Sequence, residues 1–163
     1  MGRRVFFSFH YEPDSWRASQ VRNIGAIEGS ASVSDNDWEQ VKRGGDGAIQ
    51  RWIDGQLSGR SCTVVLIGAG TAGRKWINYE IQSSWAAGKG LVGVYIHRLK
   101  NREQLQSPAG ANPFATFSVG QVNLAQIVES YDPPYIDSQQ AYGYIRDNLE
   151  NWIERAIQIR AQY

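Results

Sequence analysis

Two short runs of mostly apolar residues constrain the fold more strongly than any other feature of this sequence. They span residues 62–67 and 91–97, and neither shows the apolar–polar alternation of a strand with one face in water. Runs of this kind are typical of strands that are buried on both faces of a parallel sheet. Residues 5–11 form a third short apolar run, rich in aromatic side chains. The sequence therefore predicts three buried, parallel strands.

Segments with helical periodicity separate these runs, and parallel strands need such segments for their crossovers. The first helix is predicted to begin at Asp14 or Ser15, which are residue types that cap helices. The Gly44–Gly45 pair is expected to interrupt the second. This alternation predicts an α/β domain with a central parallel sheet and right-handed crossovers. The helices are expected at about 14–27, 38–57 and 74–87, with a weak strand at 31–34.

The last third of the sequence divides into an irregular stretch and a regular helix. Residues 99–134 are polar and punctuated by proline, and periodicity does not decide whether 122–131 forms a strand or a short helix. Asp137 and Gln140 have the spacing of a helix cap, and apolar residues then repeat every three to four positions. We predict a single domain over 1–163, with an insertion at about 99–134 and a C-terminal amphipathic helix at about 138–160.

Charge and cysteine content argue against several classes of function. The 17 Lys and Arg residues balance 16 Asp and Glu residues, for a net charge of +1, whereas binding to nucleic acid or a membrane surface calls for a basic excess. No apolar run approaches the ~20 residues of a membrane-spanning helix, and the first residues lack a signal-peptide pattern. The single cysteine, Cys62, fits a reducing compartment. We expect a cytoplasmic protein that binds neither nucleic acid nor membrane.

Two patterns resemble known ligand sites, and the sequence favours neither. Gly68, Gly70 and Gly73 have the spacing of a dinucleotide-binding loop between a strand and a helix. The next strand lacks the terminal carboxylate that such a site uses to bind ribose, so an ordinary strand-to-helix loop is favoured. His10 and His97 follow two of the strands, but no cluster of Asp, Glu or Cys completes a metal site, so no metal is expected.

Glu80 is a candidate functional residue because of its position on the third helix. It lies one turn after Trp76, at the border of the buried stripe. A carboxylate at such a border is partly desolvated, which changes its pKa and strengthens its electrostatic interactions. Spacing alone nevertheless favours a solvated glutamate, and Asp35, after the weak strand, has the same status.

Three segments, in this order and spacing, resemble a known family. Together they are similar to bacterial TIR-like domains, and in particular to the TIR-like sensors of Thoeris antiphage defence. The resemblance covers roughly residues 3–115. The segments are 3–11, then 64–68 followed by Thr71 and by Arg-Lys-Trp-Ile-Asn-Tyr-Glu-Ile at 74–81, and finally Asn112-Pro113-Phe114.

The resemblance implies a flavodoxin-like, three-layer α/β fold and an enzyme that cleaves the nicotinamide–ribose bond of NAD, its substrate, without a cofactor. It implies that Glu80, in a Trp-x-x-x-Glu setting, is the catalytic residue. The ADP-ribose would be cyclised into a signal molecule that activates a separate effector protein, and self-assembly of the domain is a further expectation. The residues expected to bind substrate are Phe7, Ser8, Phe9, His10, Tyr11, Asp35, Trp76 and Asn112.

Two other functions stay open. A TIR-like domain without activity would recruit a partner protein through its surface, and Glu80 would then be incidental. Another nucleotide-handling α/β enzyme, such as a nucleoside deoxyribosyltransferase, would also use a carboxylate at an anomeric carbon. Consumption of NAD separates the proposed enzyme from the interaction module, and nucleoside exchange would identify the transferase.

Overall fold

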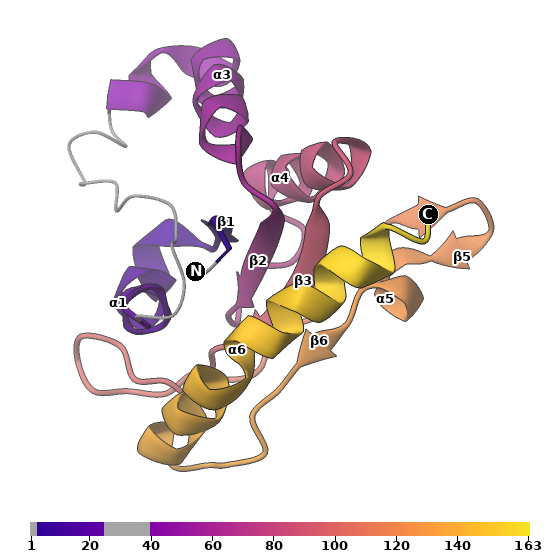
Figure 1. Ribbon diagram of the computed structural model, residues 1–163. Coiled ribbons are helices and arrows are strands. Elements are labelled where there is room, and N and C mark those ends of the chain that lie inside the picture. Colours follow the sequence, from indigo (N-terminus) through magenta and orange to yellow (C-terminus); the bar gives the residue numbers. More distant parts are fainter. Residues whose placement is uncertain (1–2, 25–39) are drawn as a thin grey trace.

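The computed structural model describes residues 3–24 and 40–163, and a four-stranded parallel sheet lies at its centre (Figure 1). The strand order is β1-β2-β3-β6. In the register, Val5 lies opposite Cys62 and Cys62 lies opposite Gly90, so the apolar runs of the sequence are hydrogen-bonded neighbours. The predicted parallel sheet is confirmed. Its strands are β1 (Val5–Ser8), β2 (Cys62–Ile67), β3 (Gly90–Tyr95) and β6 (Ser130–Tyr131).

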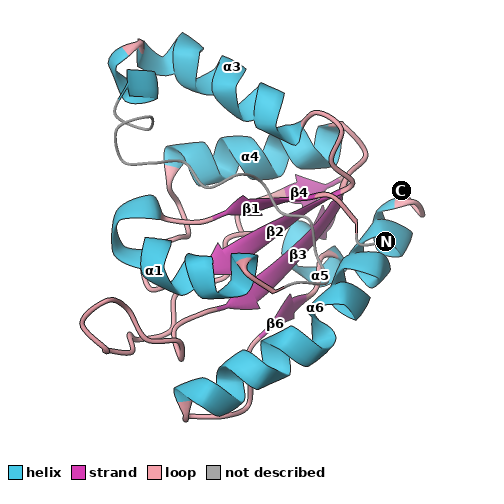
Figure 2. Ribbon diagram, turned by 60° about the vertical axis from the view of Figure 1, so that its left-hand side comes forward, coloured by secondary structure: helices cyan, strands magenta, loops and turns pink. Residues whose placement is uncertain are grey.

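Helices cover both faces of this sheet and give the domain three layers (Figure 2). One face carries α1 (Tyr11–Arg22) and the long α6 (Ser138–Arg160). The other carries α4 (Lys75–Ala86) and the short α5 (Leu124–Ile127), with α3 (Gly45–Leu57) packed on Phe6 of β1. This arrangement is a flavodoxin-like α/β fold, as expected.

The central strands explain why the sequence shows no alternation of polar and apolar residues. Successive side chains of a strand point to opposite faces. Val64 and Leu66 pack into the core under α1 and α6, whereas Val65 and Ile67 pack into the core under α4 and α5. Because both faces are covered by helices, every position of β2 is buried and apolar residues are favoured throughout.

The first crossover begins earlier than predicted. Strand β1 ends at Ser8, and α1 begins at Tyr11 with His10 as its N-cap residue, so neither Asp14 nor Ser15 caps the helix. Asp14 instead donates its backbone N–H to His10 O, as the first bond of the helix. Its carboxylate accepts from Arg17, 2.9 Å away, on the same helix. The prediction was wrong because a buried ion pair, rather than a cap, uses the Asp14 side chain.

The other boundaries differ less from the prediction. The Gly44–Gly45 pair does separate two helical stretches, with α3 beginning at Gly45, while β3 ends at Tyr95, two residues before His97. The predicted strand at 31–34 lies outside the described residues. Between β3 and α6, residues 122–131 form both kinds of element, since β5 (Val122–Asn123) pairs with β4 (Ser118–Val119) and is followed by α5 and β6.

The long helix α6 occupies the stretch for which the sequence predicts an amphipathic helix. Asp137 caps it, since the Asp137 carboxylate accepts from Gln140 N at 2.9 Å. Its apolar face, which includes Ile145, Leu149 and Ile153, is buried against the sheet. No helix in the described part of the chain is long and apolar enough to cross a membrane.

Candidate functional site

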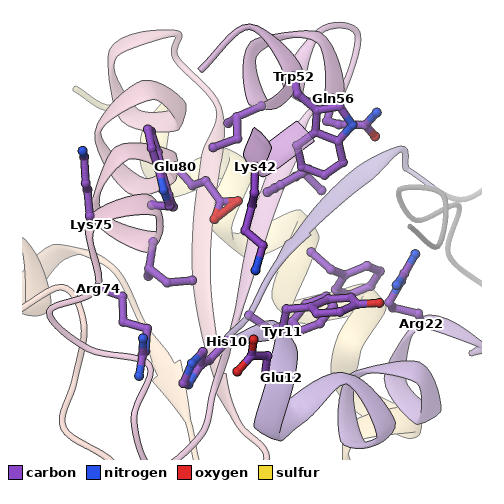
Figure 3. Close-up of a pocket in the computed structure, with 16 residues that line it drawn as sticks. His10, Tyr11, Glu12, Arg22, Lys42, Trp52, Gln56, Arg74, Lys75 and Glu80 are labelled. Atoms are coloured by element: carbon purple, nitrogen blue, oxygen red, sulfur yellow. The ribbon is translucent and has the colours of Figure 1, made fainter. Parts of the chain in front are cut away.

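A cavity of about 380 Å³ opens where the end of β1, the start of α1, α3 and the first half of α4 meet (Figure 3). Its volume lies within the range of ~300–1,000 Å³ that is usual for small-molecule sites. Two elements close in sequence, β1 and α1, form one wall, and α3 and α4 form the other. Its lining includes Phe9, His10 and Tyr11 of the first wall and Trp52, Trp76 and Glu80 of the second.

Glu80 lies at the inner end of this cavity. The side chain comes from the second turn of α4 and is only 6% exposed. Figure 3 shows its carboxyl group directed into the cavity. Ser8 Oγ donates a hydrogen bond to Glu80 Oε1 at 3.1 Å. Trp76, one helical turn earlier, lines the same cavity.

Burial controls the protonation of Glu80. It raises the pKa of the Glu80 carboxyl to about 8, because an ionised carboxylate loses its hydration there. The hydrogen bond from Ser8 opposes this change, since it stabilises the ionised form. At neutral pH the cavity therefore presents a predominantly protonated acid. A carboxyl group with a perturbed pKa in a cavity is a common property of catalytic sites.

Aromatic rings supply flat surfaces beside Glu80. Phe9 and Tyr11 stack on each other with ring centroids 6.2 Å apart. The Arg22 guanidinium lies over the Phe9 ring, 5.9 Å from its centroid. On the opposite wall the Trp76 ring lies edge-on to Tyr79. Such rings are suited to stacking with the planar ring systems of a nucleotide.

Positive charge is concentrated around the cavity. Its lining has four cationic side chains and two carboxyl groups, of which Glu80 is mostly neutral at pH 7. Burial and the neighbouring Arg74 both lower the pKa of His10, so this imidazole is neutral as well. The chain as a whole has a net charge of only +1, so the cavity suits an anionic ligand better than the average surface does. The cationic residues are Arg22, Lys42, Arg74 and Lys75.

Arg74 and Lys75 differ in their orientation although they are adjacent. Arg74 Nε donates to Gly70 O at 2.9 Å, and the guanidinium lies on the cavity side near His10 (Figure 3). Lys75 forms an ion pair with Asp46, and Figure 3 shows its side chain on the outer side of α4. Arg74 therefore presents its charge to a ligand more directly than Lys75 does.

The structure brings together most of the residues expected to bind substrate, although two of the expected residues are buried. Phe9, His10, Tyr11 and Trp76 line the cavity. Phe7 also borders it, but its ring is 3% exposed and belongs mainly to the core under α1 and α6. Ser8 is 1% exposed and contacts Glu80.

Besides Ser8, which does not line the cavity, two other expected substrate-binding residues are not placed in it. Asn112 is absent from its lining, because its side chain is used to hold a turn: Asn112 Oδ1 accepts from Phe114 N at 2.9 Å. Asp35 lies outside the described residues.

Several lining residues were not predicted. Trp52 and Gln56 on α3, and Lys42 before it, reach the cavity only because α3 packs over β1. Sequence periodicity indicates which face of α3 is apolar, but not which strand that face covers. Arg22, the last residue of α1, belongs to no sequence motif that would have identified it as a lining residue.

The glycine-rich loop before α4 has a packing role. An added Cβ at Gly68 would lie 2.0 Å from Asp14 Oδ2, so only glycine fits against this buried carboxylate. The Gly68 N–H donates to Thr71 Oγ1 at 2.8 Å, and Gly73 adopts a φ of +83°. The loop is thus explained by close packing and a turn, in agreement with the choice of an ordinary loop over a dinucleotide fingerprint.

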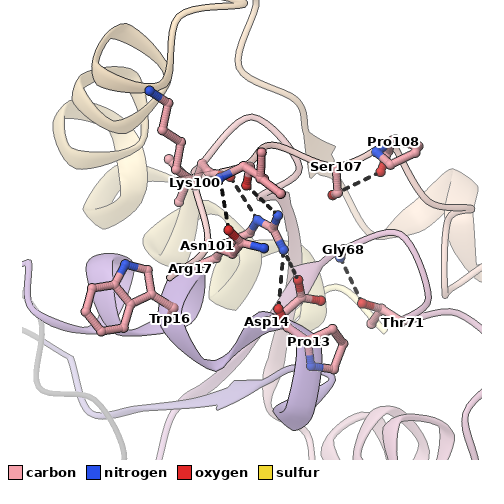
Figure 4. Close-up of polar contacts among 12 residues, drawn as sticks. Pro13, Asp14, Trp16, Arg17, Gly68, Thr71, Lys100, Asn101, Ser107 and Pro108 are labelled. Carbon is pink, nitrogen blue, oxygen red and sulfur yellow. Dashed lines mark hydrogen bonds and ion pairs between the residues drawn. The ribbon is translucent and has the colours of Figure 1, made fainter. Parts of the chain in front are cut away.

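Arg17 of α1 makes further buried contacts around Asp14 (Figure 4). Its side chain is 4% exposed and pairs with Asp14. Arg17 Nε donates to Leu99 O and Arg17 Nη2 donates to Leu105 O, each at 2.8 Å. A single buried guanidinium therefore holds the start of the 99–134 stretch against α1, which forms part of the first wall of the cavity.

No group of three or more potential metal ligands occurs among residues 3–24 and 40–163. His10 and His97 do not share a site. His97 Nε2 lies 2.9 Å from Asp132 Oδ1, and His97 does not line the cavity.

Comparison with known proteins identifies the family. Residues 6–101 match the family model described as the Thoeris protein ThsB, TIR-like domain. The chain belongs to this family. All residues that line the cavity fall inside the matched range, whereas Asn112 and α6 lie beyond it. The predicted TIR-like family and its fold are therefore confirmed.

A curated relative of this ThsB-type domain comes from Bacillus cereus (strain MSX-D12). It is named "Putative cyclic ADP-D-ribose synthase ThsB1" and is 39% identical over 119 residues. The alignment covers 70% of this chain and 62% of the relative. The chain thus matches less than two thirds of that relative's length.

Proposed function

We propose that this ThsB-type domain cleaves the nicotinamide–ribose bond of NAD and cyclises the ADP-ribose into a signal molecule. The main support is one observation: a buried carboxyl group, Glu80, faces a cavity of about 380 Å³ that has aromatic and cationic walls. The name of the Bacillus cereus relative, "Putative cyclic ADP-D-ribose synthase ThsB1", is consistent with this activity.

The reaction needs only one carboxylate. Most glycosidases use two, because one must protonate a leaving oxygen. The nicotinamide of NAD is already cationic and leaves as a neutral molecule, taking the electrons of the bond to ribose. The remaining charge develops on the ribose as an oxocarbenium ion. A fixed anion in a cavity that excludes water stabilises that charge, and Glu80 is the buried carboxyl group available for this role.

Substrate binding would convert Glu80 to its active form. Burial gives the acid a pKa of about 8, so it is mostly protonated at pH 7. The pyridinium of NAD brings a positive charge beside it, and a nearby opposite charge lowers a carboxyl pKa. Glu80 then releases its proton and faces the cationic ring as a carboxylate. The energetic cost of burying this anion is offset only when the correct cation is bound.

The cationic residues would hold the diphosphate of NAD. Arg74 lies on the cavity side at the start of α4, and Lys42, before α3, also reaches into the cavity (Figure 3). Guanidinium groups bind phosphate oxygens with two parallel hydrogen bonds. Stacking on Phe9, Tyr11 or Trp76 would orient the rings of the dinucleotide.

The nucleophile that attacks the ribose decides the product. Attack by water gives linear ADP-ribose, whereas attack by a hydroxyl or ring nitrogen of the adenosine part, with loss of one proton, gives a cyclic product. A cavity that excludes water favours cyclisation. The cyclic product would activate a separate effector protein. We place this activity in the cytoplasm, where NAD is available, and self-assembly of the domain would further close the cavity.

The proposal is tested by incubating NAD with wild type and with the Glu80→Gln variant, and separating products by chromatography with mass detection. Wild type is expected to release nicotinamide together with a product that has the mass of cyclic ADP-ribose. Glu80→Gln is expected to release none, and Glu150→Gln, an exposed carboxyl change on α6, is the matched control.

The same assay separates the alternative functions. An intact NAD pool with wild type, in lysate of phage-infected cells as well as in buffer, would favour a non-catalytic interaction module. Exchange of bases between nucleosides would identify a deoxyribosyltransferase instead. Turnover by Glu80→Gln at the wild-type rate would contradict the assignment of the catalytic carboxylate.

A further inference from the structure

Ser8 is a buried residue that contacts the carboxyl group of Glu80. Its hydroxyl is buried, since the residue is only 1% exposed, and Ser8 Oγ donates to Glu80 Oε1 at 3.1 Å. We propose that Ser8 is a positioning residue, which orients the Glu80 carboxylate and favours its ionised form. This inference rests on the proposed function, in which Glu80 acts as an anion.

Regular structure fixes both residues. Ser8 is the last residue of β1 and pairs with Val65 of the central strand. Alternation along β1 places Ser8 on the same face as Phe6, which packs under α3, while Phe7 points to the opposite core. Glu80 is held by α4 on that same face. A hydrogen bond between a strand and a helix is better defined than one between loops.

Because Ser8 is buried, it can affect catalysis only through Glu80. A side chain that is 1% exposed has no surface to offer a ligand. Its hydroxyl oxygen contacts Glu80, and Glu80 contacts the cavity. Any contribution of Ser8 to catalysis is therefore transmitted through the carboxylate, which distinguishes it from substrate-binding residues such as Tyr11 or Trp76.

The chemistry of a hydroxyl suits this position. A serine O–H donates to a carboxylate and accepts from a protonated carboxyl group, so the contact survives both states of Glu80. The bond is stronger to the ionised acid, because it is then charge-assisted. Ser8 thus lowers the pKa of Glu80 against the effect of burial. The charged or titratable residues that also line this cavity are His10, Tyr11, Glu12 and Arg22 at or in α1, Lys42 before α3, and Arg74 and Lys75 at the start of α4.

The test compares Ser8→Ala with Ser84→Ala. Ser84 is a matched control, because it is buried on the same helix as Glu80 and its hydroxyl hydrogen-bonds to Thr63 Oγ1 at 2.7 Å, away from the carboxyl group. The readouts are kcat and KM for NAD between pH 6 and 10. A second readout, the pKa of Glu80 without substrate, comes from carboxyl ¹³C NMR assigned with Glu80→Gln.

Ser8→Ala is expected to lower kcat/KM at pH 7 by about 10- to 100-fold, as expected for a lost hydrogen bond to a charged group. The loss should be recovered at higher pH, and the Glu80 pKa should rise above the wild-type value. Ser84→Ala should leave both pH profiles at the wild-type midpoint.

A wild-type midpoint in both profiles of a folded Ser8→Ala variant would overturn the inference. If Ser8→Ala does not fold, Ser8→Cys replaces it, because a thiol has a similar size and is a weak donor; an unchanged Glu80 pKa in that variant would also overturn the inference. The outcome of this test for Ser8 is independent of the outcome for the proposed function. A raised Glu80 pKa without any NAD turnover by wild type would support the role of Ser8 and contradict NAD cleavage.

Discussion

Glu80 is predicted to make the stability of the fold depend on pH in a way that Glu80→Gln removes. The pKa of this carboxyl is about 8 in the folded protein against 4.5 for an ordinary glutamate. Because the folded-state pKa is the higher one, the folded protein binds the proton more tightly. The contribution of Glu80 to stability is therefore fully present below pH 4.5 and is lost as the pH rises through 8.

The size of the effect follows from these two values. Each pH unit between them changes the free energy of unfolding by about 1.4 kcal/mol. Between pH 5 and pH 7 the wild type is expected to lose about 2 to 3 kcal/mol relative to Glu80→Gln, whose amide does not titrate. For a chain of this length that corresponds to a relative change in Tm of ~4–12 °C.

The assay is thermal and urea unfolding of both proteins at pH 5, 6, 7 and 8, followed by circular dichroism. Titration of His10, Asp14 and other groups occurs in both proteins, so it cancels in the difference between them. The stability of Glu80→Gln relative to wild type should grow steadily over this range. Parallel curves for the two proteins would show that the Glu80 carboxyl is not desolvated, and the reasoning about the cavity would be refuted.

Three further predictions concern activity and packing. The kcat/KM for NAD is expected to rise between pH 6 and 8, because the free enzyme must ionise Glu80; a flat steady-state profile over this range would contradict that role. Arg74→Ala is expected to raise KM for NAD several-fold, whereas Lys75→Ala, whose partner is Asp46, should change it little; equal effects of the two changes would argue against a diphosphate at Arg74. Arg17→Ala should destabilise the fold by about 3–5 kcal/mol in urea unfolding, since it leaves the buried Asp14 unpaired; a loss below 1 kcal/mol would show that this ion pair is not required.

The central sheet could be predicted because its signal is local. Residues 62–67 are buried at every position and carry no charge, and a strand covered on both faces is the simplest structure that needs this. The start of α1 was predicted wrongly because the role of Asp14 is not local to its own sequence position. Its partner Arg17 is fixed by carbonyl groups of Leu99 and Leu105, more than 80 residues away.

The candidate site shows the same contrast between local signals and contacts of distant residues. Spacing alone favours a solvated Glu80, and resemblance to a family was needed to predict it as the catalytic residue. Its side chain contacts Ser8, 72 positions earlier, and faces a cavity that α3 helps to line. The spacing of Trp52 and Gln56 fits an amphipathic helix, but it does not identify the strand that this helix covers. Sequence periodicity therefore could not predict these contacts between distant segments.

The most direct measurement is the release of nicotinamide from NAD by concentrated wild-type protein at pH 8, beside Glu80→Gln and Glu150→Gln. The account predicts release by wild type and Glu150→Gln, accompanied by a product with the mass of cyclic ADP-ribose, and none by Glu80→Gln. Equal release by wild type and Glu80→Gln would contradict the central claim that this buried carboxyl group cleaves NAD.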